Sequence, residues 1–240
     1  MADTERSLEL ILDALIGFAI ANGRLPCPAD PSNRAGDEAR IESGETSGCS
    51  TQSAASESNI ATGSVPWTTL GVPATDAWGH RFIYSVETRS TDRATFDACA
   101  RPPVVDVPTR CPAPEASAAI EIRQRFGRAG TLNTLPVIAT NLAAVVASSG
   151  KNGHWAFSLD GRQSRPSGID PADDEGENSI QLMSPGIVRD RATFFGGPPR
   201  AGSRDCNDRT NNAPCPFDDL VVPLSRIRLL ANFAAAGRLE

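Results

Sequence analysis

The sequence predicts an α+β fold in which a helix at each end of the chain packs on an antiparallel β-sheet. Two segments, 4–22 and 225–237, place apolar residues at helical spacing. Between them, short segments alternate apolar and polar residues as half-buried strands do. The chain has 240 residues, of which 20 are Gly and 19 are Pro, so we expect a sizeable core with many loops and turns.

We expect a single domain over residues 1–240, because neither a repeat nor a linker-like segment divides the chain. Its expected parts are a helix over 4–23, loops and sheet over 24–154, a long variable loop region over 155–216, and a last strand with a short helix over 217–240. The third part shows little periodicity. A segment of that length without regular structure often carries an interface or a function.

The first helix is expected over residues 4–22. Thr4 is a candidate N-cap, with Ser7 as the alternative, and Gly23 is placed to end the helix in the left-handed conformation. Two prolines then prevent the helix from resuming. The side chains expected to form its buried face are Leu8, Ile11, Leu12, Leu15, Phe18 and Ala19, and those expected to face water are Glu5, Glu9 and Asp13.

The middle of the chain predicts a long polar loop followed by strands. Residues 29–64 are rich in Ser, Thr, Gly and Ala, which is typical of a surface loop. Strands are expected at 81–86, where the alternation of Phe82, Tyr84 and Val86 predicts one buried face, at 118–125, within 135–150 and at 217–225. Trp67 and Trp78 are expected to anchor the core.

The second helix is expected to begin after Ser225, a candidate N-cap, and to stop at Gly237. The residues expected to supply its apolar face are Ile227, Leu229, Leu230 and Phe233.

The cysteines indicate disulfides in an oxidising compartment. Six cysteines without a C-x-x-C pair favour disulfides over a zinc site. Sequence alone allows about 15 pairings. Closure of local loops favours Cys27–Cys49, Cys99–Cys111 and Cys206–Cys215. The net charge of −6 provides no basic field, so no nucleic-acid partner is expected.

The N-terminus conflicts with an exported protein. "MADTERSLEL" carries three acids before any apolar run and does not resemble a signal peptide. No stretch of about 20 apolar residues provides a membrane span either. We therefore expect that the natural beginning of the protein lies upstream of residue 1.

Five motifs together resemble a known family. In order they are "ALIGFAIANGRLPCPAD" (14–30), "VPWTTLGVPATDAWGHRFIYSV" (65–86), "SSGKNG" (148–153), "FDDLVVPLS" (217–225) and "AAAGRL" (234–239). The chain resembles bacterial prepilin-like proteins of the type IV pilin and type II secretion pseudopilin superfamily.

The resemblance implies a pilin-like fold with a long N-terminal helix on an antiparallel sheet. Residues 4–23 would be the C-terminal half of that helix, and the preceding half would anchor the protein in the inner membrane. The implied function is a structural, non-catalytic subunit of a type IV pilus or type II secretion filament. The domain would be periplasmic before assembly and would lie in a periplasmic or cell-surface filament afterwards, with other pilins or pseudopilins as partners. The alternative is a minor, tip-located pilin that acts as an adhesin or ligand-binding module, which the long region 155–216 motivates.

The resemblance also implies a calcium site. Major pseudopilins bind calcium in a loop that follows a strand, and the implied ligands here are Ser149 through its carbonyl, Asn152 where the family has aspartate, Asp218 and Asp219. Calcium takes several oxygen ligands from flexible loops. Asp218 and Asp219 could instead be turn or capping residues. The acidic run around Asp173, Asp174 and Glu175 is another ligand source or a solvated face.

No catalytic residue is expected. Ser148 and Lys151 match the S-x-x-K pattern of serine acyl-transfer enzymes, but the motif follows an apolar strand and lacks its S-D-N and K-T-G companions. His80 and His154 have no Ser or Cys partner in an order typical of a catalytic triad.

Overall fold

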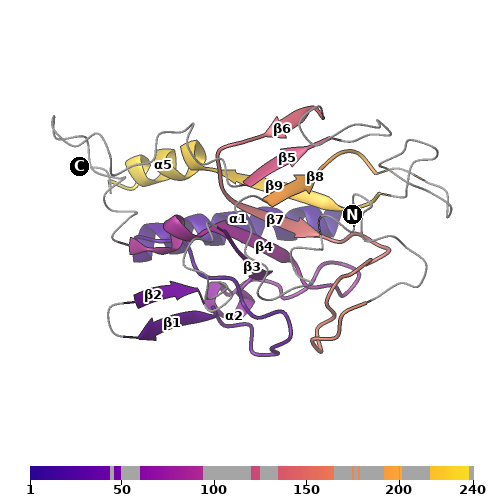
Figure 1. Ribbon diagram of the computed structural model, residues 1–240, viewed down its shortest axis with the longest axis horizontal. Helices are drawn as coiled ribbons and strands as arrows, with labels where there is room; N and C mark the ends of the chain where they lie inside the picture. The colour runs from indigo at the N-terminus through magenta and orange to yellow at the C-terminus, as the bar shows by residue number, and fades with distance from the viewer. Residues whose placement is uncertain are drawn as a thin grey trace.

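The computed structural model describes residues 1–43, 46–49, 60–93, 120–124, 135–164, 175, 178, 192–199, 201 and 217–237. The fold is α+β (Figure 1). Its elements are α1 (Ala2–Asn22), β1 (Arg40–Ser43), β2 (Thr46–Cys49), β3 (Ile60–Ser64), α2 (Trp67–Leu70), β4 (Ile83–Glu87), the 3₁₀ helix η1 (Thr88–Thr91), β5 (Ile120–Arg123), β6 (Val137–Ala139), β7 (Leu142–Ser148), β8 (Ala192–Phe195), β9 (Leu220–Ser225) and α5 (Arg226–Ala235).

Helix α1 begins two residues earlier than predicted and ends where predicted. Gly23 adopts a left-handed conformation (φ 69°), and its N–H donates to the carbonyl of Ala19 at 2.8 Å. Glycine takes this conformation without steric cost, which explains the abrupt stop. With 21 residues, α1 is not the long N-terminal helix that the sequence resemblance implies. Its buried residues are Thr4, Leu8, Ile11, Leu12, Leu15, Ile16 and Ala19.

Thr4 does not cap this helix, and the prediction of Thr4 as N-cap is wrong. The N-cap residue is Met1, without a side-chain hydrogen bond. Thr4 lies on the buried face with no exposed surface, and its Oγ1 accepts a hydrogen bond from the backbone N–H of Ala77 at 3.2 Å. Phe18, which was expected on the buried face, is only half-buried and lies beneath the guanidinium of Arg24. Ile16, which was not expected there, is buried in the core.

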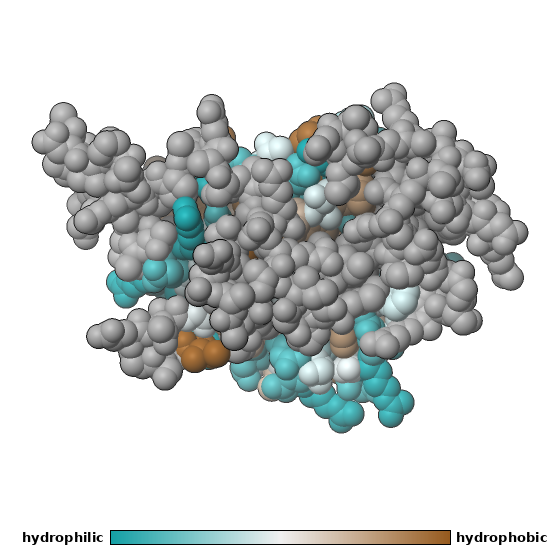
Figure 2. Space-filling view, viewed as in Figure 1, coloured by the Kyte–Doolittle hydropathy of each residue, from teal (hydrophilic) through white to brown (hydrophobic). Residues whose placement is uncertain are grey.

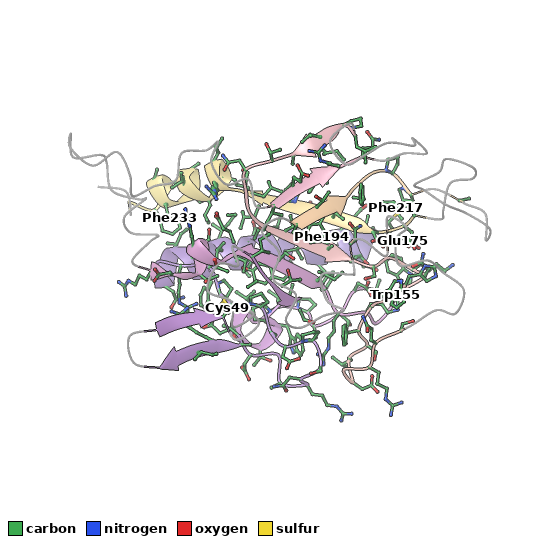
Figure 3. The ribbon with its side chains drawn as sticks, in the orientation of Figure 1. Cys49, Trp155, Glu175, Phe194, Phe217 and Phe233 are labelled. Atoms are coloured by element: carbon green, nitrogen blue, oxygen red, sulfur yellow. A yellow bond between two sulfur atoms is a disulfide. The ribbon has the colours of Figure 1, made fainter. Side chains whose placement is uncertain are left out.

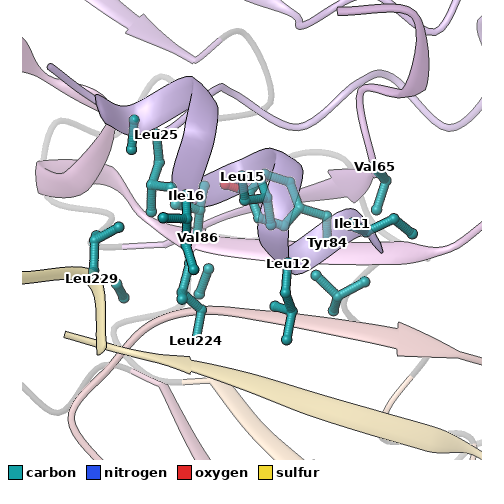
Figure 4. Close-up of a cluster of buried hydrophobic side chains, with 14 of the residues drawn as sticks. Ile11, Leu12, Leu15, Ile16, Leu25, Val65, Tyr84, Val86, Leu224 and Leu229 are labelled. Carbon is teal, nitrogen blue, oxygen red and sulfur yellow. The ribbon is translucent and has the colours of Figure 1, made fainter. Parts of the chain in front are cut away.

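The main sheet has four antiparallel strands in the order β3-β4-β7-β9. Helix α1 contacts β7 and β9 and lies along one face of this sheet (Figure 1). Figure 4 shows the core between them, where α1 side chains meet Tyr84 and Val86 of β4 and Leu224 of β9. Helix packing on an antiparallel sheet is therefore confirmed.

A second sheet covers the other face of the main sheet, so the fold has three layers. Its strands are ordered β6-β5-β8, and β5 pairs with β8 in parallel, so the sheets are not all antiparallel as predicted. Ile83 and Val145 from the main sheet pack with Ile120 and Phe194 from the second sheet. Strand β4 is consequently buried on both faces, and the prediction of a half-buried strand there is wrong.

Two expected loop regions contain strands. The hairpin of β1 and β2 and the edge strand β3 lie within 29–64, and β8 lies within 155–216. The disulfide between Cys27 and Cys49 links the chain that leaves α1 to β2, as predicted, with a Cα–Cα distance of 5.3 Å. Such a bridge stabilises by about 3 kcal/mol in the chain-entropy model. The cysteines of the other two predicted pairs, Cys99, Cys111, Cys206 and Cys215, lie outside the described residues.

Helix α5 is capped as predicted but buries a narrower face. The Ser225 side chain accepts a hydrogen bond from the N–H of Arg228. Leu229 and Phe233 are buried, whereas Ile227 is 73% and Leu230 39% exposed, so the predicted apolar face is only half correct. The helix packs on α1 and on the end of β9, which leaves these two side chains on its outer side.

Arg81 fastens the loops at one edge of the molecule. Its side chain is 1% exposed and donates to the carbonyls of Pro31, Asn33 and Leu159 at 2.7, 2.6 and 2.7 Å. Trp67 is half-buried and stacks on this guanidinium (4.5 Å) instead of anchoring the core, and Trp78 is half-buried as well. Hydrophilic side chains line the lower edge of the view in Figure 2, over these loops.

Candidate functional site

The sheet brings two of the predicted ligand segments together. Strand β7 ends at Ser148 and β9 begins at Leu220, and these two residues are paired across the antiparallel sheet. The turn that follows β7 therefore lies beside the residues that precede β9. The backbone N–H groups of Lys151 and Asn152 donate to Oδ2 of Asp218 at 2.9 and 3.2 Å.

Gly150 permits this close approach. It adopts φ 61°, and a Cβ at this position would lie 2.2 Å from Oδ1 of Asp218. Both the left-handed conformation and the lack of space disfavour a larger residue. The turn and the aspartate consequently fit together at the end of the sheet.

Glu175 joins this cluster from a distant part of the chain. It is 1% exposed, and its Oε1 and Oε2 each accept from Nδ2 of Asn152 at 2.8 Å. The His154 ring nitrogen Nδ1 lies 2.9 Å from Oε2, and the N–H of Asp218 donates to Oε1 at 3.0 Å. Figure 3 places Glu175 in the same region as Phe217 and Trp155, at the end of the molecule opposite Cys49.

Asp219 ties the second sheet to the cluster. It is 3% exposed, and its Oδ2 accepts from Nδ2 of Asn178 at 2.9 Å. Asn178 also bonds the backbone of Phe195, accepting from its N–H at 2.6 Å and donating to its carbonyl at 2.9 Å. One oxygen from each of Glu175, Asp218 and Asp219 lies within 4.8 Å of the others.

Ser149 places its side chain on the same face as Asp219. The hydroxyl of Ser148 and the side chain of Leu220 both face the α1 side, so the neighbours Ser149 and Asp219 face the other side. Ser149 is 1% exposed, and its Oγ has no hydrogen-bond partner among the described residues. Its carbonyl, the predicted ligand, accepts from the N–H of Gly153 at 3.2 Å within the turn.

The cluster gathers three carboxylates in a largely buried place. Burial, and then the neighbouring charge of Glu175, raise the pKa of Asp218 above its ordinary value. In the described part of the chain, its buried Oδ1 also has no hydrogen-bond partner. Carboxylate oxygens gathered at one place suit a hard divalent cation such as calcium, so these residues fit the predicted metal.

Ser148 has a structural role next to this site. Its hydroxyl is fully buried and donates to Oδ2 of Asp76 at 2.6 Å. Asp76 also accepts from the N–H groups of Trp78 and His80, and the His80 ring contacts the carbonyl of Gly150 at 3.1 Å. These bonds fasten the turn before β4 to the end of β7. The Ser148 hydroxyl is therefore buried and engaged in hydrogen bonds within the protein.

The predicted site residues are thus partly brought together. Asn152, Asp218 and Asp219 lie in one cluster, with Ser149 on the face of Asp219. Glu175, which the sequence offers only as another ligand source, is the central carboxylate. The sequence gives no role to Asn178, since nothing local marks an asparagine that bonds a strand 17 residues away. Asp173 and Asp174 lie outside the described residues.

Comparison with known proteins identifies no relative: no family model, curated protein or solved structure matches the chain. Within the described residues, none of the helices combines the length and the apolarity needed to cross a membrane.

Proposed function

We propose that the chain is the globular domain of a pilin or pseudopilin, a structural and non-catalytic subunit of a type IV pilus or type II secretion filament. The observation that carries this proposal is the packing of α1 along a four-stranded antiparallel sheet. A helix held in this way can serve as a spine around which the rest of the chain is wrapped. The five ordered sequence motifs support the same assignment.

The disulfide supports an oxidising compartment. Cys27 and Cys49 are 0% and 2% exposed and are bonded to each other. Structural disulfides are typical of secreted and periplasmic proteins. We propose a periplasmic domain, anchored at the inner membrane before assembly and part of a filament afterwards, with other pilin-like subunits as partners.

Immunogold electron microscopy of the source cells tests this function. Antibodies raised against the folded chain should label filaments at the cell surface or in the periplasm. The gene should also encode a basic leader and about 20 apolar residues upstream of residue 1. Label confined to the cytoplasm, with an ordinary start codon at residue 1, would contradict the proposal.

We further propose that the carboxylates of Glu175, Asp218 and Asp219 bind calcium. The cation would balance the negative charge of these three carboxylates and would hold Glu175 against the ends of β7 and β9. Calcium well above its dissociation constant should stabilise the protein by about 2 kcal/mol or more relative to EDTA.

Urea unfolding with CaCl₂ and with EDTA measures this difference. Asp219→Asn should reduce it, whereas Asp160→Asn, at an exposed position outside the cluster, should leave it unchanged. A wild-type protein whose unfolding is the same in both solutions would retire the calcium proposal.

The second sheet, β6-β5-β8, favours the alternative function, which is that of a tip-located minor pilin that binds a ligand. The edge strand β6 exposes Val137 and Ile138 by about half, at 49% and 51%. An exposed strand edge can pair with an extended segment of another protein. The presence of filaments and the adhesion of cells that lack the protein distinguish the two functions. Loss of filaments indicates a major subunit, and normal filaments with lost adhesion indicate a minor one.

A further inference from the structure

The Glu175 carboxylate already has a full set of hydrogen-bond donors. Asn152 provides two of its four bonds through one amide nitrogen, and the His154 ring and the N–H of Asp218 complete the set. A calcium ion that binds Glu175 through both oxygens must therefore displace a donor. The question is which donor it displaces.

The amide nitrogen of Asn152 occupies the position that a cation would take. It lies 2.8 Å from both Oε1 and Oε2, in the fork of the carboxylate. A calcium ion held by both oxygens of a carboxylate lies in the same fork, at roughly 2.3–2.6 Å from each. The amide and the ion cannot occupy it together.

The orientation of the amide is fixed at both ends. While Nδ2 donates to Glu175, Oδ1 of Asn152 accepts from the N–H of His154 at 3.1 Å. The amide could offer its oxygen to a cation only by rotating, which breaks this second bond as well. Asn152 is an exposed residue, so its side chain can instead turn into the solvent.

Two oxygens that are unsatisfied within the described residues indicate that a ligand belongs at this end of the sheet. The Ser149 hydroxyl is buried, faces the same side as Asp219 and has no hydrogen-bond partner among the described residues. Oδ1 of Asp218 is likewise buried and, in the same part of the chain, has no hydrogen-bond partner. Buried oxygens without donors are costly unless a cation or water satisfies them.

We propose that Asn152 is an internal competitor of calcium: its amide fills the Glu175 fork in the cation-free protein and thereby weakens calcium binding. This inference depends on the calcium site proposed above. It assigns Asn152 a role opposite to that of the ligand implied by the sequence resemblance. The amide keeps the cation-free site folded, and the ion must break two hydrogen bonds to a charged group before it binds.

Substitution of Asn152 by alanine separates a competitor from a ligand. Alanine offers no oxygen, so the loss of a ligand would weaken calcium binding, whereas the loss of a competitor strengthens it. We expect Asn152→Ala to bind calcium about three to ten times more tightly than the wild type, since hydrogen bonds to a charged group no longer oppose the ion. Isothermal titration with CaCl₂ measures the affinities, and thermal melts in EDTA show that the variant folds.

A second pair of variants tests the charge. Asn152→Asp adds a fourth carboxylate to the cluster, next to Glu175. The melting temperature of this variant in EDTA should therefore fall below that of the wild type, and its calcium affinity should rise about tenfold or more. Asn33→Asp makes the same change on an exposed loop, where the side-chain oxygen can keep its bond to the N–H of Ala35 (3.0 Å). This control should alter neither quantity.

The outcomes are distinct. Calcium affinity that is unchanged or weaker in Asn152→Ala overturns the competitor role while leaving the calcium site intact. Absence of calcium binding by the wild type and by both Asn152 variants retires the site itself, and this inference with it.

Discussion

Gly150 shows how one residue without a side chain builds the end of the sheet. Its left-handed conformation turns the chain after β7, and its Cα lies against Asp218. Gly71 has a similar conformation (φ 67°), but a Cβ there would meet no atom within 4 Å. Substitutions at the two positions therefore separate the energetic cost of the left-handed conformation from the cost of the steric clash with Asp218.

Gly71→Ala should lower the free energy of unfolding by about 1 kcal/mol, because alanine resists the left-handed conformation. Gly150→Ala should lower it by roughly a further 1–3 kcal/mol, because the methyl group displaces Asp218. Urea unfolding measures both values. Equal effects at the two positions would mean that Gly150 and Asp218 are not in contact.

Glu38 and Glu87 have pKa values that move in opposite directions. Burial opposes the ionisation of Glu38, but hydrogen bonds from Arg24 (2.8 and 2.7 Å) and from the N–H of Cys27 (3.0 Å) outweigh it, so the pKa lies below 4.5. Burial raises the pKa of Glu87 above 4.5 despite its ion pair with Arg226. Folding therefore favours the charged form of Glu38 and the neutral form of Glu87.

The pH dependence of stability should reflect this contrast. The contribution of Glu38 is present above pH 4.5 and is lost as the pH falls through its lowered folded pKa. The contribution of Glu87 is present below pH 4.5 and is lost as the pH rises through its raised folded pKa. For each of Glu38→Gln and Glu87→Gln, the difference in unfolding free energy between variant and wild type should therefore change with pH, and it should change in opposite directions for the two variants. Parallel curves for the two variants would contradict these pKa shifts.

At the scale of secondary-structure elements, the sequence pattern correctly predicted the features that depend on neighbouring residues. Helix α1, its stop at Gly23, helix α5 and its cap at Ser225 follow from spacing and capping residues. The parallel pair of β5 and β8 joins segments about 70 residues apart, and no local pattern encodes that contact. The cover that this sheet provides also explains why the alternation in β4 did not reveal its second buried face.

The candidate site was predictable to a similar degree. The run "FDDLV" and the turn "SSGKNG" flank two apolar strands, so their meeting at one sheet end follows once those strands pair. The central position of Glu175 does not follow, because it depends on how a distant segment returns to the sheet. Thr4 failed as a cap for the same reason: its partner is Ala77, far along the chain.

Substitutions along α1 should differ sharply between its two faces. Leu15 has no exposed surface, and Leu15→Ala should lower the free energy of unfolding by about 2–5 kcal/mol, because it leaves a cavity against the sheet. Leu10 is 52% exposed, so Leu10→Ala should change it by no more than about 0.5 kcal/mol. Similar losses at both positions would show that α1 is buried all round.

At the scale of the whole molecule, α1 runs between two ends of the fold, each of which is held by specific bonds. The disulfide and the Arg24–Glu38 pair secure the chain where it leaves the helix. The carboxylate cluster closes the opposite end of the sheet, as Figure 3 shows for Cys49 and Glu175. Between them, the helix and the second sheet cover the two faces of β4 and β7.

The central claim is that α1 belongs to the cooperative core of this three-layer fold, and native-state hydrogen exchange tests it most directly. Amides in the buried part of α1, from Leu8 to Ala19, should exchange only through global unfolding, with the same free energy as those of β4 and β7. Exchange of these α1 amides through a local opening at much lower free energy would contradict the claim and remove the structural basis for a pilin-like spine.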